Sequence, residues 1–171
     1  MVKLKRITKK VLFAKTVQLL QPKLRLEDWK IVVRFLPKTR PNNIVAYCQP
    51  MPEYKSAGIR VNMTRLAELN HYEVVSTAIH EMLHCVTWSM TEWAEQLCRK
   101  DKQKLEVTRK LDEGIITHLE RMLTDITLPQ LQKELTAEGY ANLDTAFDSF
   151  KVMSVPTVKA AKKKPKKKIK R

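Results

Sequence analysis

Glycine, aromatic residues and long apolar stretches are all scarce in this chain of 171 residues. Only three residues are glycine and 6% are aromatic, which argues against a turn-rich or repeat-built β fold. No run of about 18 apolar residues is present, so we expect no membrane-spanning helix. Lys15 interrupts the apolar residues 11–20, so these do not form the core of a signal peptide. These absences leave a mostly helical protein with no membrane segment.

Cysteine is also scarce, and its spacing excludes two common uses. Cys48, Cys85 and Cys98 are odd in number and form no Cys-x-x-Cys pair. A disulfide framework and a cysteine-rich zinc module are therefore not expected. We expect reduced cysteines and a cytoplasmic protein.

The net charge of +15 is concentrated at the C-terminal end. Nine cations lie within residues 159–171, and removing them leaves +6 (15 minus 9) for the rest of the chain. We expect residues 1–153 to form one domain and residues 154–171 to be a disordered Lys-rich tail, because the tail has too little apolar content to fold. Such a polycation can contact nucleic acid non-specifically, and a role in solubility or targeting is an equal alternative.

The pattern of apolar residues predicts the order of helices and strands. Residues 28–36 are rich in β-branched and aromatic side chains, and Arg60 alternates with apolar neighbours, which indicates strands with one wet face. The fold class is α+β, with a small antiparallel sheet of about three strands packed on a mostly helical core. The predicted strands are 28–36, 44–48 and 57–62; the predicted helices are 8–20, 64–70, 74–88, 92–123 with a break near 100–104, 129–135 and 140–150.

One segment, His-Glu-Met-Leu-His at residues 80–84, carries recognisable chemistry. His80 and His84 are four residues apart, so one helical turn brings both imidazoles to the same face, where they can hold a Zn²⁺ ion. Glu81 lies about 100° around the helix, where it can reach a metal-bound water and act as general base. The alternative is that both histidines are core residues that bond backbone carbonyls.

A catalytic zinc usually takes a third protein ligand, and three residues are candidates. Projecting Leu111, Ile115, Ile116, Leu119 and Met122 onto a helix gives an apolar face with Asp112 near its centre. Glu113 has the longer side chain for reaching between helices, and Gly114 beside it permits close approach. We therefore rank Glu113 first, Asp112 close behind and His118 third.

The two histidines, Glu81 and this acidic pair resemble the minimal gluzincin-like zinc metallopeptidases of phages and bacteria. The metzincin pattern is excluded because it needs glycine at Thr87 and histidine at Met90. The resemblance implies a zincin-like core, a protein or peptide substrate and hydrolysis of the peptide bond. It also implies that a strand before the helix binds substrate by strand addition, and residues 57–61 occupy that position.

Two other functions remain open. Residues 80–88 are also similar to the SprT-type DNA-associated proteases, although that family's third histidine and zinc-ribbon cysteines are missing. The second alternative is a non-enzymatic, nucleic-acid-associated or structural protein in which a metal only stabilises the fold.

Overall fold

The computed structural model describes residues 6–37, 44–99 and 101–140, and the fold is α+β, as predicted. The predicted tail at 154–171 lies outside the described residues, as does the predicted helix 140–150 beyond Tyr140. In chain order, the elements are α1 (Lys9–Lys23), β1 (Lys30–Leu36), β2 (Ala46–Met51), the 3-10 turn η1 (Pro52–Tyr54), β3 (Ser56–Asn62), α2 (Met63–Glu68), α3 (His71–Cys98) and α4 (Lys102–Ala137).

The sheet is mixed, so the prediction of a purely antiparallel sheet was wrong. Its order is β1-β3-β2, with β3 antiparallel to β2 and parallel to β1. The turn η1 joins β2 and β3 as a hairpin, and β1 adds to the far edge of β3 instead of pairing with β2. Alternating side chains reveal a strand and its two faces, but they do not reveal the order of the strands.

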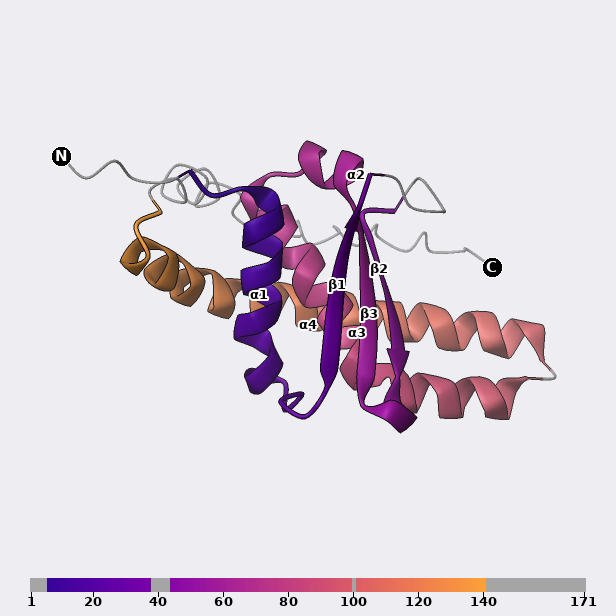
Figure 1. Ribbon diagram of the computed structural model, residues 1–171. Coiled ribbons are helices and arrows are strands. Elements are labelled where there is room, and N and C mark those ends of the chain that lie inside the picture. The colour runs from indigo at the N-terminus through magenta and orange to yellow at the C-terminus, as the bar shows by residue number, and fades with distance from the viewer. Residues whose placement is uncertain (1–5, 38–43, 100, 141–171) are drawn as a thin grey trace, which may run out of the picture.

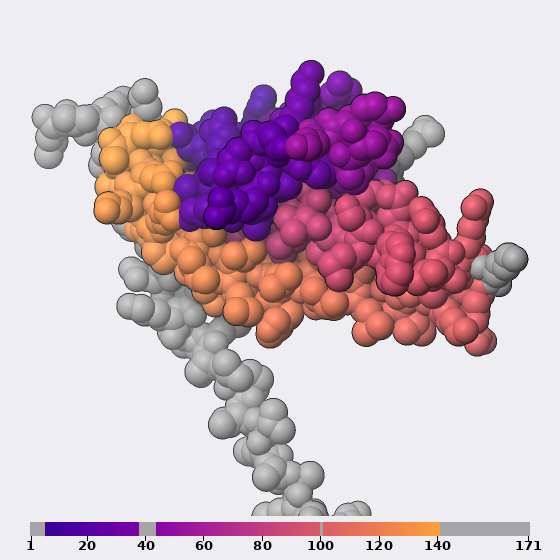
Figure 2. Space-filling model, turned by 90° about the horizontal axis from the view of Figure 1, so that it is seen from below, coloured from indigo at the N-terminus to yellow at the C-terminus, as the bar shows by residue number. Residues whose placement is uncertain are grey.

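One face of the sheet packs on helices and the other face is open. In Figure 1 the three strands lie in front of α3, with α1 beside β1. The inward residues of β3 are the buried Ala57, Ile59 and Val61, and Phe13 of α1 meets Phe35 of β1 edge to face. Figure 2 shows this N-terminal half, in indigo and purple, stacked on the pink and orange helices α3 and α4. The molecule is therefore layered, with α3 between the sheet and α4.

Helix α3 begins at a fixed residue and is buried over its first half. Asn70 accepts a bond from the N–H of Glu73, and the Glu73 carboxylate accepts one from the N–H of Asn70, which is a capping box. Buried apolar residues then recur as far as Cys85. Because the start is fixed and the first half is packed, the positions of His80 and His84 around the helix are also fixed.

Beyond Cys85, α3 and α4 continue as a two-helix arm that extends past the sheet (Figure 1). The predicted break near 100–104 is confirmed, because α3 ends at Cys98 and α4 begins at Lys102. The predicted separate helix at 129–135 is wrong. Pro129 lies inside α4 at an exposed position, where the carbonyl of Asp125, which loses its helical hydrogen bond, can be solvated by water.

The predicted apolar face of α4 is also wrong in orientation. Of its five members only Ile116 is buried, whereas Leu111, Ile115, Leu119 and Met122 are exposed. The buried or half-buried residues at this end of α4 are Leu105, Thr108, Asp112 and Ile116, so the packed side lies next to the apolar stripe and shares Ile116 with it. Within the described residues, no helix combines the length and the apolar character needed to cross a bilayer.

Candidate metal centre

Two imidazoles on α3 and one carboxylate on α4 converge at the base of the arm. The Nε2 atom of His80 lies 3.6 Å from the Glu113 carboxylate, and the Nε2 atom of His84 lies 3.8 Å from its other oxygen. One nitrogen from each histidine and one Glu113 oxygen all fall within 4.8 Å of one another. Two imidazole nitrogens and one carboxylate oxygen are a donor set found in catalytic zinc sites.

Of the three acidic or basic candidates on α4, the structure brings only Glu113 into this group. Asp112 is close enough to influence His84 electrostatically, but it is not a member of the cluster. His118 is exposed and also lies outside the cluster. Asp112 is half-buried and Glu113 is exposed, but it is the longer side chain of Glu113 that reaches both histidines.

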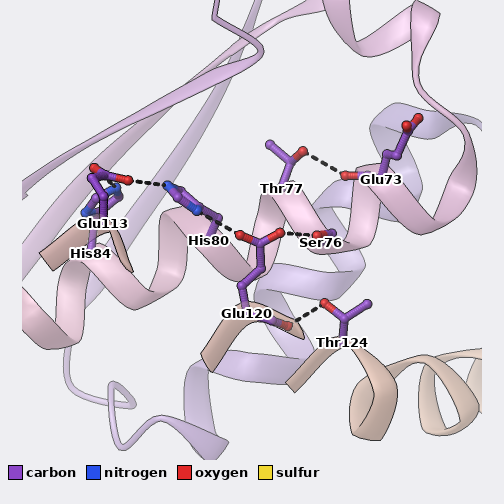
Figure 3. Close-up of polar contacts among 8 residues, drawn as sticks. All are labelled: Glu73, Ser76, Thr77, His80, His84, Glu113, Glu120 and Thr124. Carbon is purple, nitrogen blue, oxygen red and sulfur yellow. Dashed lines mark hydrogen bonds and ion pairs between the residues drawn. The ribbon is translucent and has the colours of Figure 1, made fainter. Parts of the chain in front are cut away.

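A second carboxylate, Glu120, holds the opposite side of the His80 ring (Figure 3). Its Oε2 atom lies 2.9 Å from His80 Nδ1, and its other oxygen accepts a hydrogen bond from the Ser76 hydroxyl. A carboxylate at Nδ1 fixes the ring orientation and leaves Nε2 free to bind a metal. Sequence reasoning missed Glu120, yet it lies seven residues after Glu113, two turns along the same face of α4.

These contacts shift the pKa values of the centre in different directions. Burial opposes ionisation of Glu120, but the hydrogen bonds from His80 and Ser76 outweigh it and lower the Glu120 pKa. The bond to Glu120 raises the pKa of His80 above its usual value. Burial and the neighbouring His80 ring lower the pKa of His84. The two imidazoles therefore differ in basicity: His80, next to Glu120, is more basic than His84.

Glu81 points away from α4 toward the sheet and is only 6% exposed. Burial raises its pKa to about 7, although the nearby His80 and a hydrogen bond from the Cys48 backbone N–H on β2 oppose the rise. A carboxyl group with a pKa near neutrality can both accept and return a proton at physiological pH. This position therefore suits the proton-transfer role that the sequence predicted for Glu81.

A cleft of about 290 Å³ runs between β2 and the centre. His80, Glu81, His84 and Trp88 of α3 line it together with Glu113 of α4 and residues of β2. All four chemically active side chains therefore reach one solvent-accessible space, which a reacting molecule could enter.

The strand beside this cleft is β2, not the predicted 57–61 segment. That segment lies within β3, which is central and paired on both sides, so its backbone cannot accept another strand. The N–H of Asn62 donates to the carbonyl of Val45. By the alternation of an antiparallel ladder, the backbone groups of Ala46 and Cys48 then turn away from β3, toward the cleft.

Comparisons of the chain with protein-family models, with curated proteins and with solved structures find no match.

Proposed function

We propose that this protein is a zinc-dependent peptidase that hydrolyses peptide bonds in the cleft between β2 and α3. The observation that carries the proposal is the convergence of His80, His84 and Glu113 in a cleft that also contains the buried carboxyl of Glu81. When bound by these three residues, zinc would lower the pKa of a coordinated water and polarise the substrate carbonyl.

Glu81 supplies the proton transfer in this proposal. Its carboxylate accepts a proton from the attacking water and returns it to the leaving amine. Burial keeps its pKa near neutrality, so both directions of transfer are accessible at physiological pH. Glu120 contributes indirectly, because its bond to Nδ1 keeps the Nε2 atom of His80 directed at Glu113.

Strand β2 supplies the binding of the substrate backbone. The outward N–H and C=O groups of Ala46 and the C=O group of Cys48 can pair with an extended peptide, which adds a strand to the sheet. Backbone pairing of this kind places little demand on substrate sequence. We therefore propose an extended or unfolded polypeptide as the substrate class.

The cellular compartment belongs to the same proposal. The three cysteines are free thiols, and the sulfur atoms of Cys48 and Cys85 lie 3.6 Å apart without a covalent bond. We propose the cytoplasm, because the odd number of cysteines and the lack of a Cys-x-x-Cys pair argue against a disulfide framework.

The test combines zinc binding with hydrolysis of an unfolded protein such as reduced casein. We expect wild-type protein to bind about one equivalent of zinc and to cleave the substrate, because the three donors form one site. We expect Glu81→Gln to bind zinc equally well and to lose at least about 100-fold in rate, because the amide cannot accept the proton.

Glu95→Gln is the matched control, because Glu95 is a carboxylate on α3 that pairs with Arg109 away from the centre. It should hydrolyse casein at the wild-type rate. If wild-type protein binds zinc and gains thermal stability but cleaves nothing, the peptidase proposal is wrong. The centre is then a structural zinc site that links α3 and α4. Equal activity in wild type and Glu81→Gln would remove Glu81 as the base.

A further inference from the structure

The open face of the sheet combines cations, a hollow and apolar side chains. Three cross-strand rows follow from the pairing register: Arg34 with Arg60 and Tyr47, Val32 with Gly58 and Gln49, and Lys30 with Ser56 and Met51. Every outward residue is therefore basic, neutral polar or apolar, and none is acidic. The outward residues are Lys30, Val32, Arg34, Tyr47, Gln49, Met51, Ser56, Gly58 and Arg60.

The cations of this face have no partners in the part of the chain that the structure describes. No ion pair there involves Lys30, Arg34 or Arg60. Arg34 and Arg60 are direct neighbours on adjacent strands, an arrangement of like charges that destabilises a sheet. An anion bound between them would remove that repulsion, so the face is electrostatically complementary to a negatively charged ligand.

The centre of the face is hollow because Gly58 has no side chain. The hollow measures about 310 Å³, at the lower end of the range for small-molecule pockets of about 300–1,000 Å³. Exposed Val32 and Met51 give it apolar walls, and Gln49 adds a hydrogen-bonding amide. The cations stand at its two ends, with Lys30 at one and the arginines at the other.

We propose that this face binds single-stranded nucleic acid, with one base seated over Gly58 and the flanking phosphates held by Lys30, Arg34 and Arg60. An apolar hollow with an amide suits an unpaired base, and cations on either side suit the backbone that continues from it. A duplex would keep its bases stacked and out of the hollow, which is why the ligand is single-stranded. The site is separate from the metal centre and does not depend on the proposed peptidase activity.

The test measures binding of a fluorescent oligodeoxythymidylate of about 12 nucleotides to the full-length protein at several salt concentrations. The first variant combines Lys30→Gln, Arg34→Gln and Arg60→Gln. We expect it to bind more weakly, and its plot of log affinity against log salt should be shallower by about 2, because three phosphate contacts are lost. Its matched control combines Arg99→Gln, Lys102→Gln and Lys133→Gln, which removes the same charge from exposed positions outside the sheet.

The control separates this face from general basicity, including that of residues 159–171. We expect the control to retain the salt dependence of the wild-type protein. Equal behaviour of the two triple variants would overturn the proposal, because binding would then follow net charge alone.

The second variant, Gly58→Val, tests the base. A Cβ at Gly58 meets no atom within 4 Å, and valine favours strands, so the variant should fold. We expect the filled hollow to weaken oligonucleotide binding about tenfold, as for the loss of one base contact. Binding of inorganic polyphosphate, which has no bases, should not change. Wild-type affinity of Gly58→Val for the oligonucleotide would overturn the assignment of this face to nucleic acid.

Discussion

The two faces of the three-stranded sheet differ in chemistry although the same strands build both. The inner residues of β3, such as Ile59, are buried and apolar, and they support the helix that carries the metal centre. The outer residues, such as Arg60, are exposed and include cations without partners in the described chain. The comparison shows that alternate residues of one strand can have different roles. The inner residues stabilise the fold, whereas the outer residues provide cations and a hollow that the fold does not need for its stability.

The largest expected effect is on the inner face of β3, at Ile59. Ile59→Ala should lower the free energy of unfolding by about 2–5 kcal/mol, because it leaves a cavity in the core. Urea unfolding of the full-length protein measures the effect. A loss below about 0.5 kcal/mol, the range of surface substitutions, would contradict the assignment of Ile59 to the packed face.

The next largest effect is expected at the metal centre, which the inner face of the sheet supports, and substitutions of Glu120 measure it. Glu120→Ala should weaken zinc binding about 10- to 100-fold, because His80 loses the group that orients its ring. Glu120→Gln should have a smaller effect, since its amide oxygen can still accept a bond from Nδ1. Zinc titration against a competing chelator measures both variants. Asp125→Ala, at an exposed carboxylate of the same helix, is the control and should bind zinc as wild type does.

The smallest expected effect is at Arg60 on the outer face. Arg60→Gln should leave the free energy of unfolding within about 0.5 kcal/mol of wild type. Any change should be a stabilisation at low salt, because the substitution relieves repulsion with Arg34. Urea unfolding at low and high salt measures it. A large decrease in the free energy of unfolding would show that Arg60 stabilises the fold. It would contradict the division into a stabilising inner face and an outer face that contributes little to stability.

The local part of the centre was predictable from sequence because helix geometry fixes it. Four residues make one turn, so His80 and His84 share a face wherever the helix lies, and Glu81 follows at a fixed angle. The capping box at Asn70 and Glu73 adds a start signal that can also be read from sequence. A prediction of this kind needs no knowledge of tertiary packing.

The contribution of α4 was harder to predict because it depends on how two helices pack. Leu111, Ile115, Leu119 and Met122 form the most apolar stripe of α4, yet they face solvent. Apolar periodicity alone therefore put four apolar residues on the wrong side of the helix, and it favoured Asp112, which is half-buried but does not join the cluster. Glu113 and Glu120, two turns apart, are the carboxylates that contact the histidines of α3.

The order of the strands in the sheet was also hard to predict, because it too depends on tertiary packing. Alternation correctly indicated three strands and the wet position of Arg60, because side chains of a strand point to opposite faces in turn. It could not reveal that β3 is central, because strand order depends on long-range pairing. The substrate strand was therefore assigned to residues 57–61, whereas the free edge beside the cleft belongs to β2.

The most direct test of the proposed metal centre is calorimetric titration of zinc into chelator-treated, full-length protein. We expect about one equivalent to bind to wild type, and we expect Glu113→Gln to bind much more weakly because a carboxylate ligand is lost. Asp112→Asn and His118→Asn should bind as wild type does, because neither residue belongs to the cluster. Absence of zinc binding by wild type, or equal affinity in Glu113→Gln, would contradict the centre proposed for His80, His84 and Glu113.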